Sequence, residues 1–261
     1  MPSSTVPNTS AIRPSPQPVA DRVRVAAALV VAAAWTVAVF HGGIRGSWAD
    51  GPLGTAPLTL GLSALVAMAL TVGRPWRRPA RLVLVRPGRL RVPAGSGFRW
   101  YVVAQIMILT GSAVPQLDVD PLRDRDVPAV TLAALAALVI AVLVAAVFDG
   151  RPRLDLTSHG IEVRDPAGRR TIPWAALAAG RPLRQPHGHK LVLTVAHPEL
   201  VEQRGLVRGS ATAPLLTLTW LWVQPWFLAD ALRWYVDHPA ERAALGTPAG
   251  DERLRRALGV G

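Results

Sequence analysis

The histidines are the residues of this chain whose type and spacing come nearest to a metal site. His187 and His189 stand two positions apart in "HGHK", and on a strand such a pair would share one face. Imidazoles bind zinc, but a site needs further ligands, and only His159 and His197 could approach in the fold. Solvated loop histidines explain the pattern more simply, so we expect no metal and no cofactor.

Patterns that indicate catalysis are absent from the sequence. The chain has no cysteine, which excludes disulfides, thiolate metal sites and cysteine nucleophiles. It also lacks a glycine-rich phosphate loop, a Gly-x-Ser-x-Gly elbow and a His-Glu-x-x-His helix. The densest acidic cluster, "DVDPLRDRD" at 118–126, is typical of a solvated segment. We therefore expect a protein without enzymatic activity.

The charge of the chain is strongly basic, with a formal net charge of +12 carried almost entirely by arginine, since Lys190 is the only lysine. Such a balance often indicates nucleic-acid binding. Here, however, 50% of the residues are hydrophobic, the mean hydropathy is +0.28, and most arginines flank apolar runs. Membrane orientation explains this distribution better, so we expect no nucleic-acid partner.

Four apolar runs without a charged residue predict transmembrane helices: Val25–Phe40, Leu53–Val72, Trp100–Val114 and Pro128–Phe148. A helix needs about 20 apolar residues to cross a bilayer, with a lower limit of about 17. The second and fourth runs are long enough, whereas the first and third need flanking residues. The alternative for the two short runs is a buried helix of a soluble core.

The loops between these runs predict the orientation of the chain. Residues 73–99 hold eight arginines and no acid, whereas residues 115–127 hold four aspartates and two arginines. Cytoplasmic loops are enriched in positive charge. We therefore predict a multi-pass protein of the cell membrane, with the 73–99 loop and both termini in the cytoplasm.

The arginines of the 73–99 loop are also candidates for lipid contact. Three of them flank Trp76, and three line a hairpin predicted to turn at Pro87 and Gly88. Anionic lipid attracts such residues by about 1 kcal/mol each. We predict headgroup contacts, with topology alone as the alternative, for Arg74, Arg77, Arg78, Arg86, Arg89 and Arg91.

After residue 149 the pattern changes to short alternating stretches that predict β-strands. "RLDL" and "GIEVR" read as a hairpin, "DPAG" at 165–168 fits a type I turn, and "RTIPW", "KLVLTVA" and "PLLTLTWLWV" read as further strands. On the last of these, Leu216, Leu218, Trp220 and Trp222 would share a face.

Pro225 stands where a helix can begin, and the residues that follow it have helical periodicity. One face would carry Phe227, Leu228, Ala231, Leu232 and Tyr235, and the other Asp230, Arg233 and Asp237. A fifth membrane span at 214–232 is the alternative, which Pro225 and Asp230 disfavour.

Residues 151–239 resemble the bacterial PH-like domain of small membrane proteins, particularly actinobacterial ones. The matching stretches are "LDLTSHGIEVR", "TIPW" ending at Trp174, and "LADALRWYVDHPAERAALG". The resemblance implies a β barrel or sandwich of about seven strands, closed at one end by the C-terminal helix. The turn "TSHG" contains no lysine or arginine, so the phosphoinositide site of eukaryotic PH domains is not carried over.

Three residues are predicted to have structural roles in this fold. Gly160 would permit the tight turn before Ile161, Trp174 would be a buried anchor with its N–H near a partner, and Pro225 would open the helix. The stretch "RLVLVRPGRLRV" at 81–92 parallels "RLDLTSHGIEV" at 153–163. A hairpin packed on the larger domain explains this better than a true repeat.

The predicted organisation has four parts. A disordered tail, which is not a signal peptide, covers residues 1–20; four transmembrane helices lie within 21–149; the cytoplasmic PH-like domain spans 150–239; and a tail covers 240–261. We predict a non-enzymatic membrane protein that presents this domain as a scaffold or interaction module, with membrane lipids and an unknown protein as partners. The alternative is an accessory subunit of a transport or cell-envelope complex; the absence of ionisable groups within the spans disfavours independent transport.

Overall fold

The structure, a computed structural model, describes residues 56–73, 75–113, 127–150, 152–185 and 188–260. The predicted N-terminal tail, the first apolar run and the acidic connection at 118–126 therefore lie outside the described residues. In the helix over 127–148, side chains are described at position 131 and at 134–148.

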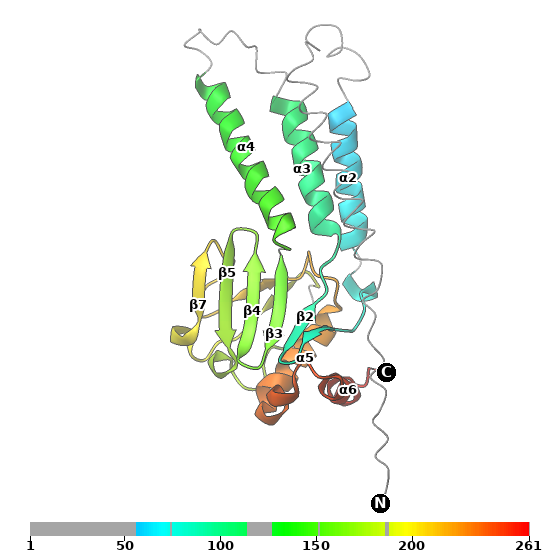
Figure 1. Cartoon of the computed structure of the whole chain (residues 1–261), viewed down its shortest axis with the longest axis vertical. Coiled ribbons are helices and arrows are strands. Elements are labelled where there is room, and N and C mark those ends of the chain that lie inside the picture. The colour runs from blue at the N-terminus through cyan, green and yellow to red at the C-terminus, as the bar shows by residue number, and fades with distance from the viewer. Residues whose placement is uncertain (1–55, 74, 114–126, 151, 186–187, 261) are drawn as a thin grey trace, which may run out of the picture.

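Three helices extend from one end of a β-rich domain (Figure 1): α2 Ala56–Val72, α3 Gly97–Ala113 and α4 Val127–Phe148. Small and apolar residues hold them together, and buried side chains such as Ala64, Val102 and Met107 form their common core with Ala146 of α4. Among the described residues, no helix combines the length and the hydrophobicity that a membrane crossing requires.

The β-strands form two antiparallel sheets. The larger has the order β1-β2-β3-β4-β5-β7 and consists of β1 Val83–Arg86, β2 Arg89–Val92, β3 Arg153–Thr157, β4 Gly160–Asp165, β5 Gly168–Pro173 and β7 Glu202–Gly205. The smaller pairs β6 Lys190–Val192 with β8 Leu215–Thr217. The described residues thus contain eight strands, close to the predicted number of about seven.

The predicted 81–92 hairpin is present, and it is an integral part of the larger sheet. Strand β2 pairs with β3, which places Leu90 opposite Leu156 and Val92 opposite Leu154. All four side chains are buried in the same core. The domain therefore extends beyond the predicted 150–239, because two of its strands come from the loop between α2 and α3.

The amphipathic helix α5, Pro225–Asp237, begins at its proline as predicted and packs its apolar face on the sheets. Phe227, Leu228, Ala231, Leu232 and Tyr235 are all buried. Asp230 lies on the opposite face with Arg233, as predicted, and the two form an ion pair. Its carboxylate is nevertheless buried, because Arg184 also binds it.

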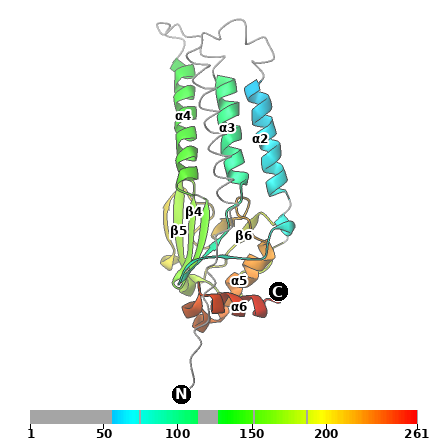
Figure 2. The same ribbon diagram turned by 45° about the vertical axis from the view of Figure 1, so that its right-hand side comes forward.

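The predicted tail at 240–261 is folded against the domain over its described part, 240–260. The 3₁₀ segment η5, Pro239–Ala244, and helix α6, Pro248–Ala257, cover the end of the domain that lies away from α2–α4 (Figure 2). Leu245 and Leu254 are fully buried, and the amide of Gly88 donates to the carbonyl of Leu245 at 2.9 Å. The C-terminal segment thus packs against the turn of the β1–β2 hairpin.

The segment 214–232 is strand, turn and helix, so the alternative of a fifth membrane span does not fit it. Strand β8 is also shorter than predicted, and Trp220 does not continue its inner face. The Trp220 ring instead packs against Phe98 and Tyr101 at the base of α3, with ring centroids 5.6 and 5.4 Å apart. This contact fixes the domain to the helices.

Gly160 is required for close packing rather than for a positive φ angle. A Cβ atom at this position would lie 2.2 Å from the carbonyl oxygen of Ile172 on β5. Trp174 is buried as predicted, at 3% exposure, and its Nε1–H donates to the carbonyl of Thr157 at 2.8 Å. The predicted turn at 165–168 joins β4 to β5, with Asp165 paired to Gly168.

Candidate functional site

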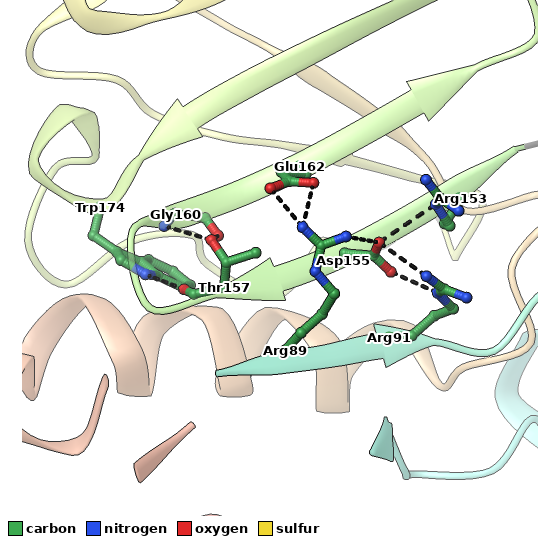
Figure 3. A network of polar contacts seen from close by, with 8 residues as sticks. All are labelled: Arg89, Arg91, Arg153, Asp155, Thr157, Gly160, Glu162 and Trp174. Carbon is green, nitrogen blue, oxygen red and sulfur yellow. Dashed lines mark hydrogen bonds and ion pairs between the residues drawn. The ribbon is translucent and has the colours of Figure 1, made fainter. Parts of the chain in front are cut away.

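The outer face of the larger sheet carries a network of charged side chains, shown in Figure 3. Strands β2, β3 and β4 alternate apolar residues, which enter the core, with charged residues on the opposite face. Those outward positions hold Arg89 and Arg91 on β2, Arg153 and Asp155 on β3, and Glu162 on β4.

Asp155 lies at the centre of this network and is only 1% exposed. Its Oδ1 accepts from Nε of Arg91 at 2.7 Å, and its Oδ2 accepts from Nη1 of Arg89 at 3.2 Å. Nε of Arg153 is 3.4 Å from Oδ2. Arg89 also donates from Nη2 to both carboxylate oxygens of Glu162 at 2.9 Å. Asp155 and Glu162 thus bind the β1–β2 hairpin to the rest of the sheet.

Positive charge exceeds negative charge in the network. Burial lowers the pKa of the Arg153 guanidinium from its ordinary value; Asp155 opposes this shift, and the cations of Arg164, Arg91 and Arg89 add to it. Arginine nevertheless stays protonated in proteins at neutral pH. The carboxylates and guanidinium groups of this network are paired with one another, so the network holds the sheet together, and its excess of positive charge favours anions over cations at this face.

The arginines predicted to contact headgroups are in several different environments. Arg74 lies outside the described residues, and Arg77 and Arg86 are exposed. Arg89 and Arg91 form the ion pairs with Asp155 and Glu162, so their guanidinium groups already have partners within the domain. The structure therefore favours a role in sheet assembly for these two residues over the predicted contact with lipid.

Arg78 is likewise a structural residue, with 3% exposure. Its Nη1 donates to the carbonyls of Leu218 and Leu221 at 2.8 and 2.9 Å, and its Nη2 donates to the carbonyl of Val72 at 2.9 Å. Val72 is the last residue of α2, where carbonyls lack partners within the helix. Arg78 thus joins the end of α2 to the loop after β8, and it does not reach solvent or lipid.

We predict that Arg78→Ala lowers the free energy of unfolding by about 2 kcal/mol, because buried carbonyls lose a charged hydrogen-bond donor. Thermal and urea melts of the full chain in detergent would measure this loss. Arg77→Ala is the matched control, since Arg77 is exposed, and its effect should stay within about 0.5 kcal/mol. Equal effects of the two variants would contradict the structural role of Arg78.

The histidines considered for a metal site are not brought together among the described residues. His159 is exposed at the turn between β3 and β4, and Nδ1 of His197 lies 3.1 Å from a carboxylate oxygen of Glu199. Burial, together with the cation of Arg78, lowers the pKa of His189. His187 lies outside the described residues, and no group of three metal-binding side chains occurs in the described part of the chain.

The sequence patterns did not identify Asp155 and Glu162, which pair with arginines on the outer face of the sheet, or Arg170, which joins β5 to β7 and to the loop that follows it. Asp155 and Glu162 stand at outward positions of two strands, and Arg-x-Arg at 89–91 stands at outward positions of a third. The alternation of charged and apolar residues indicates that these side chains point outward. Only the pairing of β2 with β3 shows that the arginines lie beside the carboxylates. Arg170 gave no signal; it donates to the carbonyls of Arg208 and Gly209 and to the side chain of Gln203.

Comparison with known proteins supports the resemblance found in the sequence. Residues 151–210, less than a quarter of the chain, match the family model described as the bacterial PH domain. This part of the chain is similar to bacterial PH domains. No curated protein and no solved structure matches the chain. We call the two sheets, with α5, η5 and α6, the PH-like domain. Such domains are generally interaction modules without catalysis, and no enzyme family is indicated.

Proposed function

We propose that this protein is a multi-pass protein of the cell membrane, whose apolar helices hold the PH-like domain at the cytoplasmic surface as a scaffold for a protein partner or for the membrane. The observation that carries the proposal is the pairing of β2 with β3. It puts the arginine-rich loop 73–99 and the domain after α4 on the same side of the three helices.

The directions of the helices agree with this arrangement. The C-terminal end of α2, the N-terminal end of α3 and the C-terminal end of α4 all adjoin the PH-like domain (Figure 1). A membrane around these helices would leave both the basic loop and the domain on one side. Because basic loops favour the cytoplasm, that side is the cytoplasmic one in our proposal.

The surfaces of α2 and α4 give the second support. They expose large apolar side chains along much of their lengths: Leu60, Leu62, Val66 and Leu70 on α2, and Leu135, Leu138, Val139 and Val142 on α4. Soluble monomers rarely expose large continuous apolar areas. Lipid or other apolar helices would cover these residues without a cost in free energy.

Cysteine accessibility tests the proposed topology, because the chain has no cysteine of its own. In intact cells, a membrane-impermeant maleimide should label Arg123→Cys, in the acidic connection, and should not label Ser158→Cys, at the exposed β3–β4 turn, until the cells are permeabilised. Alkaline carbonate should leave the chain in the membrane fraction. Labelling of Ser158→Cys in intact cells, or release by carbonate, would refute the proposal.

A further inference from the structure

Four arginines stand directly opposite one another across four strands of the larger sheet. Arg153 on β3 pairs with Arg164 on β4, Arg164 pairs with Arg169 on β5, and Arg169 pairs with Arg204 on β7. Directly opposed residues point to the same face, which here is the outer face. We call these four residues the arginine row. Like charges placed opposite one another destabilise a sheet, so the row has a cost in stability.

The neighbouring row of the same face carries three carboxylates, those of Asp155, Glu162 and Glu202, of which the first two are bound by Arg89 and Arg91. Within the described residues, the structure gives an ion pair to Arg153 alone among the four, with the carboxylate of Asp155 that Arg89 and Arg91 also use. Arg169 and Arg204 are exposed and Arg164 is partly exposed, whereas Arg153 is 19% exposed. The positive charge of Arg164, Arg169 and Arg204 is therefore available to an external anion.

The row lies at the end of the sheet that faces the helices. Helix α4 ends at Phe148, and β3 begins five residues later with Arg153. The arrowheads of β4 and β7, which end just beyond Arg164 and Arg204, point toward the helices (Figure 1). Two apolar side chains flank this end: Leu206 is 81% exposed and Phe148 is 78% exposed, more than any other large apolar residue in the described part of the chain.

We infer that the arginine row, with Leu206 beside it, docks on the anionic phosphate headgroups of the bilayer that holds α2–α4. Arginine binds phosphate oxygens in a bidentate manner, and Leu206 would enter the apolar margin of the headgroup layer. The anionic surface offsets the repulsion within the row. This inference rests on the proposed function and moves the lipid contact from the 73–99 loop to the sheet.

A single label can report this docking in the full chain. Leu206→Cys carrying an environment-sensitive fluorophore is compared in phosphatidylcholine vesicles with and without phosphatidylglycerol. In the anionic vesicles, the emission should shift to the blue, and a quencher attached to the lipid chains should reach the label. Ser158→Cys, at the opposite end of β3, is the control position and should respond in neither vesicle. Salt should reverse the shift at position 206.

Charge removal then tests the row itself. Each arginine near an anionic surface strengthens docking about fivefold, so Arg164→Gln/Arg169→Gln/Arg204→Gln should weaken it about a hundredfold. The control Arg86→Gln/Arg255→Gln/Arg256→Gln removes the same charge from the far end of the domain, where α6 lies (Figure 2), and should keep the response. In detergent the first variant should melt at or above the temperature of the parent, because it relieves repulsion.

Several results would overturn the inference. The label at position 206 could respond equally in both vesicles, or both triple variants could respond equally. Inorganic phosphate in detergent could reproduce the shift, which would make the row a site for soluble phosphate. Binding of RNA that depends on the row, without a response to lipid, would make it a nucleic-acid surface. If carbonate leaves the chain in the membrane while any of these results holds, only this inference fails; release by carbonate would also refute the proposed function.

Discussion

The variant Trp174→Ala is expected to lower the free energy of unfolding of the PH-like domain by about 3–5 kcal/mol, the usual range for removal of a large buried aromatic side chain. The indole is 3% exposed and packs against Tyr235, with ring centroids 5.9 Å apart. The guanidinium of Arg242 lies over the indole ring, 5.6 Å from the ring centroid. Truncation to alanine would leave a cavity between the sheet and α5.

The measurement is urea unfolding of the full chain in detergent, followed by the β-sheet signal in circular dichroism. Trp222→Ala is the matched control, because Trp222 is 39% exposed, and it should cost less than about 1 kcal/mol. Trp174→Phe keeps most of the packing but removes the bond from Nε1 to the carbonyl of Thr157, and should cost about 1–2 kcal/mol. A loss below about 1 kcal/mol for Trp174→Ala would show that this side chain does not anchor the core.

The second large effect is expected at Asp155. The variant Asp155→Ala removes the one carboxylate that Arg89, Arg91 and Arg153 share. Removing one partner of a buried ion pair costs about 3–5 kcal/mol, and the partial exposure of the three arginines brings our expectation to about 3 kcal/mol. The β1–β2 hairpin should separate from the sheet first, because the network attaches it to β3.

Hydrogen exchange of the full chain in detergent would detect that separation as faster exchange of the amides of 83–92. Glu162→Gln is the control at the margin of the same network, where the side chain is 29% exposed and, within the described part of the chain, pairs only with Arg89. It should cost about 1 kcal/mol or less. The double variant Asp155→Ala/Arg91→Gln should recover part of the lost stability, because it removes an unpaired cation. Additive losses would contradict the assigned network.

The PH-like domain could be predicted in outline because its signals are local. Alternation of apolar residues gives strands, "DPAG" gives the turn between β4 and β5, and Pro225 followed by a helical apolar pattern gives α5. The burial of Trp174 could be predicted for the same reason, since a large aromatic side chain at the end of an apolar strand removes the most apolar surface from water when it packs into the core. Each of these features depends on neighbours within a few positions in the sequence.

The sequence was less informative about residues whose partners lie far along the chain. The eight arginines of 73–99 form a single basic loop in the sequence, and they indicated topology and lipid contact. Only the tertiary structure separates them: Arg89 and Arg91 pair with carboxylates that lie more than 60 residues away, and Arg78 caps α2 and bonds to a loop about 140 residues away. Net charge in a segment does not reveal which side chains are neutralised.

The register of the strands determines which side chains form the candidate site. This register depends on the pairing of several strands and cannot be deduced from any one of them. Arg153, Arg164, Arg169 and Arg204 are unremarkable within their own strands, and the pairing of β3 through β7 sets them side by side. A shift of one residue in any pairing would send them to the other face of the sheet. The sequence by itself therefore determined the kinds of elements and much of the core, because burial follows local periodicity. The tertiary structure alone decided which charges are paired and which face outward, because that depends on contacts between distant segments.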